Sequence, residues 1–181
     1  VFTDTRKPLP RGLFFALQGP NFNADSFAET ALELGAIAAV VSKKKAFSSR
    51  VKEFIAVDDP LITLQQLANY HRRQLSTQII ALTGSNGKTT IKEWLGELLA
   101  PHTSVCKNPK SYNSKLGVPL SLLQLNKNHQ LGIFETGISK PGEMKLLADL
   151  IQAEFSIFTN LGAAHDEGFT SRAEKLEEKM H

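Results

Sequence analysis

Residues 78–90 read QIIALTGSNGKTT, and this stretch decides the fold of the chain. Residues 78–83 form an apolar run of strand length, and the apolar positions of residues 88–99 recur at helical spacing. A glycine-rich loop between a strand and a helix is the setting that a phosphate-binding loop requires. The stretch therefore predicts a strand, a phosphate loop and a helix, and with them an α/β fold.

The residue types in this loop suit a nucleotide. The glycines allow main-chain N–H groups to surround phosphate oxygens, and the helix N-terminus adds its positive dipole. Lys88 would reach the terminal phosphates and the Thr89 hydroxyl would ligate Mg²⁺, although Leu82 stands where the usual pattern has a glycine, so the loop is a shortened form. The structural alternative is a glycine turn followed by a capped helix. The residues predicted to bind ATP are Gly84, Ser85, Asn86, Gly87, Lys88, Thr89 and Thr90.

Strand and helix patterns alternate along the whole chain, which predicts parallel sheets with helices on both faces. The domain boundary is expected in residues 74–79, which gives domains 1–76 and 77–181. Trp94 and the leucine stripe that follows it are predicted to be helix core. Predicted strands cover 12–17, 36–41, 54–57, 78–83, 103–106, 131–134 and 155–159, and predicted helices cover 23–35, 60–75, 88–99, 116–125, 141–151 and 171 onward.

The composition excludes several classes of protein. Hydrophobic residues make up 41% of the 181 residues and charged residues 22%, which excludes disordered, collagen-like and coiled-coil chains. The net charge of +3 is too small to indicate nucleic-acid binding. No stretch approaches the roughly 20 apolar residues that span a bilayer. The single cysteine, Cys106, excludes a disulfide framework and favours a reducing, cytoplasmic setting.

Both ends of the chain lead us to expect a longer protein. Val1 enters directly into a strand-like run without an initiator Met. The last helical pattern stops at His181 without a cap, so we expect that the natural protein continues beyond it.

Two further side chains are expected beside the phosphate loop. Glu135 ends the apolar strand 131–134, and His165 lies in the loop that leaves strand 155–159. Because ligands of parallel sheets gather at the carboxyl ends of the strands, both side chains are candidate Mg²⁺ ligands. The alternatives are a solvent-exposed glutamate and a surface histidine. Charges at helical spacing over 174–179 predict a solvated helix face that includes Lys179.

These motifs, in this order, resemble the Mur ligase family, the ATP-dependent amide-forming enzymes of peptidoglycan precursor synthesis. The resemblance covers essentially the whole chain. It implies a small N-terminal UDP-sugar-binding α/β domain, followed by the first part of a P-loop-type parallel-sheet ATPase domain. The matching segments are the shortened phosphate loop 83–89, the Glu-x-Gly metal site 135–137, the Asn-x-x-x-x-His metal loop 160–165, and the UDP-sugar segments 3–6 and 12–19.

The resemblance also implies roles for individual residues. Mg²⁺, as two ions, would be held by Thr89, Glu135, His165 and Lys179, where Lys179 lies fourteen positions beyond His165 and would be carbamylated. Lys88, His165 and Lys179 would be the catalytic residues. The substrate-binding residues would be Asp4, Thr5 and Arg6 for the uridine diphosphate, together with Asn113, at the junction of the nucleotide and peptide sites, and Ser114. Many relatives have Asn-Asn at the last two positions, so Ser114 departs from the pattern.

Within the family, residues 111–119 and 163–169 are most similar to the member that joins D-Ala-D-Ala to UDP-N-acetylmuramoyl-tripeptide through an acyl phosphate. Residues 138–144 are similar to a form fused to a C-terminal alanine racemase, which would be absent here. The family's C-terminal ligase domain, which helps to bind the amine, would be absent as well. We therefore expect residues 1–181 alone to bind nucleotide weakly and not to ligate.

Other functions stay open from the sequence. Within the superfamily, they are another Mur ligase step and a folylpolyglutamate synthase-like ligase. From other classes, they are a nucleotide-binding switch or transport ATPase, and a non-catalytic nucleotide-binding module. The shortened loop and the segment 3–6 favour the ligases.

Overall fold

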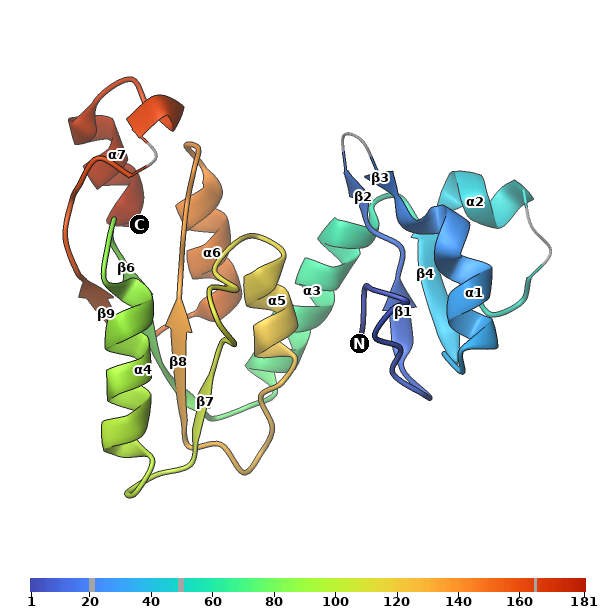
Figure 1. The fold of residues 1–181 in the computed structure, drawn as a ribbon, viewed down its shortest axis with the longest axis horizontal. Coiled ribbons are helices and arrows are strands. Elements are labelled where there is room, and N and C mark those ends of the chain that lie inside the picture. Colours follow the sequence, from blue (N-terminus) through green and yellow to red (C-terminus); the bar gives the residue numbers. More distant parts are fainter. Residues whose placement is uncertain (20–21, 49–50, 165) are drawn as a thin grey trace. The chain divides into compact units, whose positions relative to one another are not determined.

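Parallel strands joined by helices make up most of the chain, which confirms the α/β fold that the sequence predicts (Figure 1). The computed structural model describes residues 1–19, 22–48, 51–164 and 166–181. By its internal contacts the chain divides into two units, Val1–Gln66 and Leu67–His181. The division falls inside helix α3 (Pro60–Arg73). The functional domains 1–76 and 77–181 stay a prediction.

The first unit contains a small parallel sheet in the order β1-β4-β5. Phe2 extends it through a bridge to Phe14, so the segment 3–6 follows at the carboxyl end of β1. Asn23 caps the 3₁₀ helix η1 because its side-chain oxygen accepts a hydrogen bond from the Asp25 N–H at 2.9 Å. The strands are β1 (Leu13–Phe15), β2 (Gln18–Gly19), β3 (Phe22–Asn23), β4 (Ala38–Ser42) and β5 (Phe54–Val57), and the helices are η1 (Ala24–Phe27), α1 (Ala28–Glu33) and α2 (Lys43–Ser48).

The second unit is built on a parallel sheet in the order β7-β8-β6-β9. The central strand β6 pairs with β8 on one side and β9 on the other, and its end is in register with Glu135 and Phe158. The loop after β6, the end of β8 and the loop after β9 therefore meet at one edge of the sheet. The strands are β6 (Gln78–Thr83), β7 (Val105–Lys107), β8 (Leu131–Glu135) and β9 (Phe155–Phe158).

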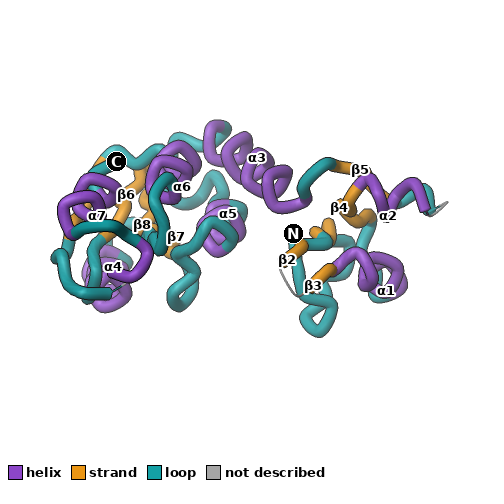
Figure 2. The backbone as a smooth tube through the Cα atoms, turned by 90° about the horizontal axis from the view of Figure 1, so that it is seen from above, coloured by secondary structure: helices purple, strands orange, loops and turns teal. Residues whose placement is uncertain are grey.

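Helices cover both faces of this second sheet (Figures 1 and 2). Helix α4 lies on one face, while α5 and α6 lie on the other face and enclose the main apolar core. Helix α7 packs against α6. The helices are α4 (Lys88–Leu99), α5 (Gly117–Leu122), α6 (Glu143–Ile151), the 3₁₀ helix η2 (Asp166–Gly168) and α7 (Arg172–Lys179).

The predicted boundaries of the strand 78–83 and of the helix 88–99 are confirmed without a shift. Both elements are set by local signals. The apolar run of the strand ends at Gly84, and the helical spacing of apolar residues begins directly after Gly87. Among the helices of the described ranges, none combines the length and the apolar character that crossing a bilayer requires.

Candidate nucleotide and metal site

The loop between β6 and α4 has a backbone that requires its two glycines. Gly84 has φ +134° and Gly87 has φ +79°, a region that residues with a side chain rarely adopt. A Cβ on Gly84 would also collide with the hydroxyl of Thr159, which lies directly after β9. The loop can therefore turn tightly against the neighbouring strand end only with glycine at residue 84.

The segment after β9 holds this loop in place. The Ser85 N–H donates to the Asn160 carbonyl at 2.8 Å, and the Asn86 N–H donates to the Asn160 side-chain oxygen at 3.1 Å. The Thr159 hydroxyl donates to the Asn86 carbonyl at 2.6 Å, and the Ser85 hydroxyl donates to the Gly162 carbonyl at 3.2 Å. The phosphate loop and the start of the predicted metal loop thus form one hydrogen-bonded unit.

Lys88 begins helix α4, and its ammonium lies over the loop. Its Nζ donates to the Gly84 carbonyl at 2.8 Å and to the Ser85 carbonyl at 3.3 Å. Burial lowers the pKa of Lys88, and the negative charge of Glu135 partly opposes this shift. Thr90 lies in the same helical turn and is exposed. An ammonium at this point can pair with the phosphates of a nucleotide held by the loop.

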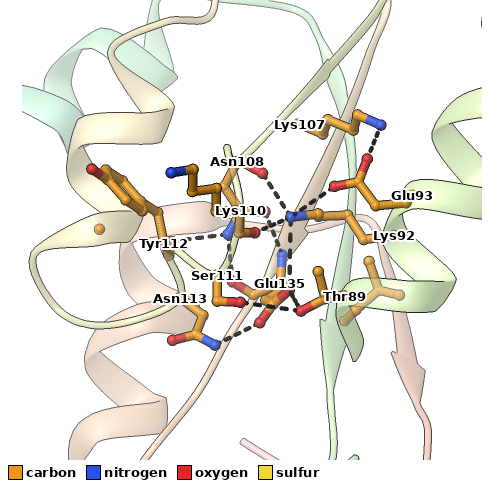
Figure 3. A network of polar contacts seen from close by, with 12 residues as sticks. Thr89, Lys92, Glu93, Lys107, Asn108, Lys110, Ser111, Tyr112, Asn113 and Glu135 are labelled. Atoms are coloured by element: carbon orange, nitrogen blue, oxygen red, sulfur yellow. Dashed lines mark hydrogen bonds and ion pairs between the residues drawn. The ribbon is translucent and has the colours of Figure 1, made fainter. Parts of the chain in front are cut away.

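Thr89 and Glu135 meet at the junction of α4 and β8 (Figure 3). The Thr89 hydroxyl donates to Glu135 Oε2 at 2.7 Å. The other carboxylate oxygen, Oε1, accepts from the side-chain amide of Asn113 at 2.5 Å. Glu135 is only 1% exposed, so these contacts, with the ammonium of Lys92 3.7 Å from Oε2, hold its carboxylate. The predicted neighbours of the phosphate loop thus include a buried, oriented carboxylate.

The donor set at this junction fits Mg²⁺. A hydroxyl and a carboxylate are the oxygen ligands that Mg²⁺ takes, and the ion commonly uses only one or two protein groups together with waters and substrate phosphates. Over residues 1–19, 22–48, 51–164 and 166–181, no group of three or more His, Cys, Asp or Glu side chains could hold a metal by itself. His165, the third predicted ligand, lies outside the described residues.

Lys179 reaches the phosphate loop from α7. Its side chain is only 5% exposed and its Nζ lies 3.4 Å from the Gly84 carbonyl. Burial and the charges of Lys88 and Lys175 lower its pKa from 10.5 to about 8. The prediction of a solvated face over 174–179 is wrong for Lys175, Glu178 and Lys179, which are all buried. Their partners lie on distant parts of the chain, which charge spacing along one helix does not indicate.

Lys175 and Glu178 explain how α7 is held. Lys175 donates to the Gly162 carbonyl at 2.6 Å and to Asp166 at 2.5 Å, so it binds the loop that follows β9. Glu178 accepts from the Met144 N–H at 2.8 Å at the start of α6. Helix α7 is thus attached to the loop after β9 and to α6 through buried charged side chains.

The predicted substrate residues lie in both units. In the first unit, Arg6 donates to Asp4 through Nε at 2.9 Å and Nη2 at 2.8 Å. These bonds lower the pKa of Asp4 to about 2, and Thr5 lies between the two residues, half-buried. In the second unit, Asn113 binds Glu135 as described above. The Ser114 hydroxyl accepts from the Gly117 N–H at 3.2 Å, at the start of α5.

A family model described as the Mur ligase middle domain matches residues 82–181, from the end of β6 to the end of the chain. The chain belongs to the Mur ligase family. Over 180 residues it is 36% identical to UDP-N-acetylmuramoyl-tripeptide–D-alanyl-D-alanine ligase of Bacillus subtilis. The aligned region covers 99% of this chain and 39% of that protein. The chain thus spans about two fifths of the length of this Mur ligase.

Solved Mur ligase structures share the fold. The MurF ligase from Thermotoga maritima in complex with ADP has a TM-score of 0.89 at 31% identity, over 99% of this chain and 41% of that chain. MurF from Acinetobacter baumannii has a TM-score of 0.88 at 32% identity, over 98% of this chain and 39% of that chain. These likenesses extend over both units of this Mur ligase chain.

One residue of this Mur ligase site was missed by the sequence reasoning. Lys92, in the second turn of α4, is 0% exposed and contacts Glu135. The prediction that Trp94 and Leu98 belong to the helix core is wrong, because both are exposed and Lys92 and Gly96 occupy the buried face instead. The available signal was position: Lys92 follows Thr89 by three residues and precedes Gly96 by four, so all three share one face of the helix.

Proposed function

We propose that this chain is part of an ATP-dependent acid–amino-acid ligase, the part that binds ATP and activates the substrate carboxylate. The ligase joins D-Ala-D-Ala to UDP-N-acetylmuramoyl-tripeptide in peptidoglycan precursor synthesis. The observation that carries the proposal is the placement of Lys88, Thr89 and Glu135 at one sheet edge, with Thr89 hydrogen-bonded to Glu135 at 2.7 Å. The names of the relatives support the choice of this step within the family.

The first chemical step is the activation of a carboxylate. A carboxylate oxygen of the UDP-linked tripeptide attacks the γ-phosphorus of ATP, and the bond from this phosphorus to the bridging oxygen of ADP breaks. Attacking group and phosphate are both anions, so positive charge at the loop decides the rate. The ammonium of Lys88, already directed at the loop carbonyls, would turn to the phosphate oxygens when a nucleotide binds.

Mg²⁺ would be held by Thr89 and Glu135, together with His165 and Lys179, and the family resemblance implies two ions. The bound ions would supply charge that offsets the charge of the phosphate oxygens. Glu135 suits this role because its carboxylate is oriented by Thr89 and Asn113 before any ligand arrives.

Lys179 would contribute as a carbamate. The ammonium first loses one proton, and addition of CO₂ to the neutral amine then forms an N–C bond and releases a second proton, so that an anion replaces a cation. The lowered pKa of Lys179, about 8, raises the neutral fraction of its amine at neutral pH. The modification would also replace the repulsion between Lys179 and the ammonium groups of Lys88 and Lys175 by attraction.

The second step forms the amide. The amine of D-Ala-D-Ala attacks the acyl carbon, the C–O bond to phosphate breaks, and inorganic phosphate and a proton are released. Asp4, Thr5 and Arg6 would hold the uridine-diphosphate end of the substrate, and Arg6 carries the guanidinium that binds anionic oxygens in pairs. Asn113 and Ser114 would lie on the peptide side.

The proposal is tested by release of ADP from ATP by the full-length protein, measured over a set of UDP-muramoyl-peptides with D-Ala-D-Ala present or omitted. We expect stoichiometric ADP and amide only with the tripeptide and the dipeptide together. Amide formation with another amino acid would assign a different Mur step, and a glutamate acceptor on a folate would assign the folate ligase. Nucleotide binding without turnover would instead support a non-catalytic nucleotide-binding module.

A cytoplasmic setting and a fused alanine racemase stay predictions. Both are tested on the complete protein, by fractionation of cells and by an assay for the interconversion of L-alanine and D-alanine. Racemase activity in the same polypeptide would support the fusion, and its absence would contradict it.

A further inference from the structure

Lys92 carries a positive charge in the fully buried interior of the second unit (Figure 3). It lies one helical turn after Thr89 on α4, and its Nζ donates to the main-chain carbonyl of Asn108 at 2.7 Å and to that of Lys110. Glu93 Oε1 lies 3.3 Å away and Glu135 Oε2 3.7 Å away. The ammonium is thus surrounded by oxygen atoms from its own helix, from β8 and from the segment 108–113.

Two of the attachments of the segment 108–113 are made by fully buried side chains. The first is the side-chain amide of Asn108, which accepts from the Glu135 N–H at 3.0 Å and donates to the Glu135 carbonyl at 3.0 Å and to the Tyr112 carbonyl at 2.9 Å. The second is the ammonium of Lys92, which binds the segment to α4. At its far end, Asn113 donates to Glu135 Oε1. Lys92 therefore ties this segment to the helix that follows the phosphate loop from the buried side, and the hydroxyls of Ser111 and Thr89 meet on the exposed side.

Burying a lysine costs desolvation free energy unless the ammonium is paired and fully hydrogen-bonded. An apolar side chain of similar size would pack at this point with a lower desolvation cost. The ammonium acts on carbonyls and on Glu135, so its effect on any ligand passes through these groups. The exposed part of the segment adjoins the reacting end of the proposed site, because the hydroxyls of Ser111 and Thr89 lie 3.4 Å apart. A carboxylate that approaches a γ-phosphate beside Thr89 therefore meets the segment 108–113.

We propose that Lys92 is a positioning residue that holds the segment 108–113 and the Glu135 carboxylate against α4, and thereby sets the binding of the UDP-linked peptide substrate. The inference rests on the proposed function, because it concerns the substrate of that reaction. The phosphate loop has separate attachments, to Asn160 and Gly162, so loss of Lys92 leaves its backbone in place. Lys92 thus acts on the segment 108–113 and on Glu135, and not on the backbone of the phosphate loop.

The test compares three variants of the full-length protein. Lys92→Met removes the charge and the donor, and Lys92→Gln keeps a neutral donor in a shorter side chain. Lys107→Met is the matched control, because Lys107 binds the same Glu93, while no dashed line in Figure 3 joins it to the segment carbonyls or to Glu135. The readouts are hydrogen exchange of peptides over 84–89 and 108–113, the KM values for ATP and for UDP-muramoyl-tripeptide, and the Kd of metal-free ADP.

For Lys92→Met we expect exchange over 108–113 to accelerate and the KM for the UDP-linked substrate to rise, each by about tenfold. Exchange over 84–89 and the Kd of ADP should stay within about twofold of wild type, as should every constant of Lys107→Met. Lys92→Gln should lie between Lys92→Met and wild type. A general loss of stability would not raise the KM for the UDP-linked substrate while it leaves the Kd of ADP unchanged.

Unchanged exchange over 108–113 together with an unchanged KM would overturn the proposal. Equal acceleration in both segments, or failure of both Lys92 variants to fold, would assign Lys92 a structural role and overturn it as well. Hydrogen exchange needs no turnover, so it separates the two proposals. A wild-type protein without ligase activity would reject the proposed function, while the exchange contrast would still decide whether Lys92 positions the segment.

Discussion

The carboxyl edges of the two parallel sheets differ in how far their charged side chains are exposed to solvent. In the second unit several charged side chains near this edge are buried, namely Lys92, Glu135, Lys175 and Lys179. In the first unit the predicted substrate pair is open to solvent, with the side chain of Arg6 87% exposed and that of Asp4 38% exposed. The buried acid of that unit, Asp25, accepts from the neutral donors Ser42 and Gln18.

This difference indicates two ways to build a ligand site. Buried charges must keep their partners, because a lost partner leaves an ion without solvent, so the second edge is oriented before any ligand binds. An exposed ion pair contributes little to stability and can exchange its partner for a ligand at low cost. We therefore expect the nucleotide side to be preorganised, and the uridine-diphosphate side to form its contacts when the substrate arrives.

The largest expected effect is on turnover. Lys88→Ala should lower ATP-dependent ligation by the full-length protein by about a thousandfold, because it removes the cation at the transferred phosphate. The fold should persist, since the Lys88 ammonium donates to carbonyls of its own loop. Initial rates of ADP release measure the effect, with Lys145→Ala, an exposed lysine on α6, as the control. Activity equal to wild type would remove Lys88 from the proposed mechanism.

The next prediction compares the buried acids of the two units. Glu135→Ala should lower the free energy of unfolding of the second unit by about 3–5 kcal/mol, because Lys92 would lose one of its two acidic partners and the buried donors of Thr89 and Asn113 would lose their acceptor. Asp25→Ala should cost the first unit about 1–3 kcal/mol, because only neutral donors lose their acceptor. Hydrogen exchange of the Ile133 and Val40 amides reports each unit separately. Equal losses would contradict the contrast between the two edges.

A smaller effect is expected at the exposed pair. Arg6→Ala should weaken binding of the UDP-linked substrate by about tenfold, because it removes a charge-assisted pair of donors to phosphate oxygens. The thermal midpoint should not change, since the pair is exposed. Isothermal titration with UDP-muramoyl-tripeptide measures the affinity, and Lys7→Ala, a neighbouring exposed cation, serves as the control. An unaltered Kd would exclude Arg6 from the substrate site.

The last prediction concerns the pH dependence of stability. The pKa of Lys179 is about 8 in the folded chain against its usual 10.5, so the folded state loses this proton first as the pH rises. Between about pH 8 and 10.5 the unfolded state binds more protons, and the contribution of Lys179 to stability therefore increases with pH. The difference in unfolding free energy between wild type and Lys179→Met should rise over this window. A flat difference would show that Lys179 is not held among cations.

The local elements of the site could be predicted from the sequence. The apolar run 78–83, the glycines and the helical spacing of 88–99 are all signals between near neighbours, so the strand, loop and helix followed directly. The proximity of Glu135 to the phosphate loop also followed, because strand ends of a parallel sheet share one edge. His165 lies outside the described residues, so its predicted place at that edge stays untested.

Period and order along the chain were enough to specify the α/β alternation and the residues that can meet at the edge of the second sheet. The burial of individual charges followed instead from tertiary contacts. Lys92 lies inside while Trp94 lies outside, and Lys179 faces the phosphate loop rather than water. The physical reason is that burial depends on what approaches each helix from distant segments: the carbonyls of 108 and 110 for α4, and the loops after β6 and β9 for α7.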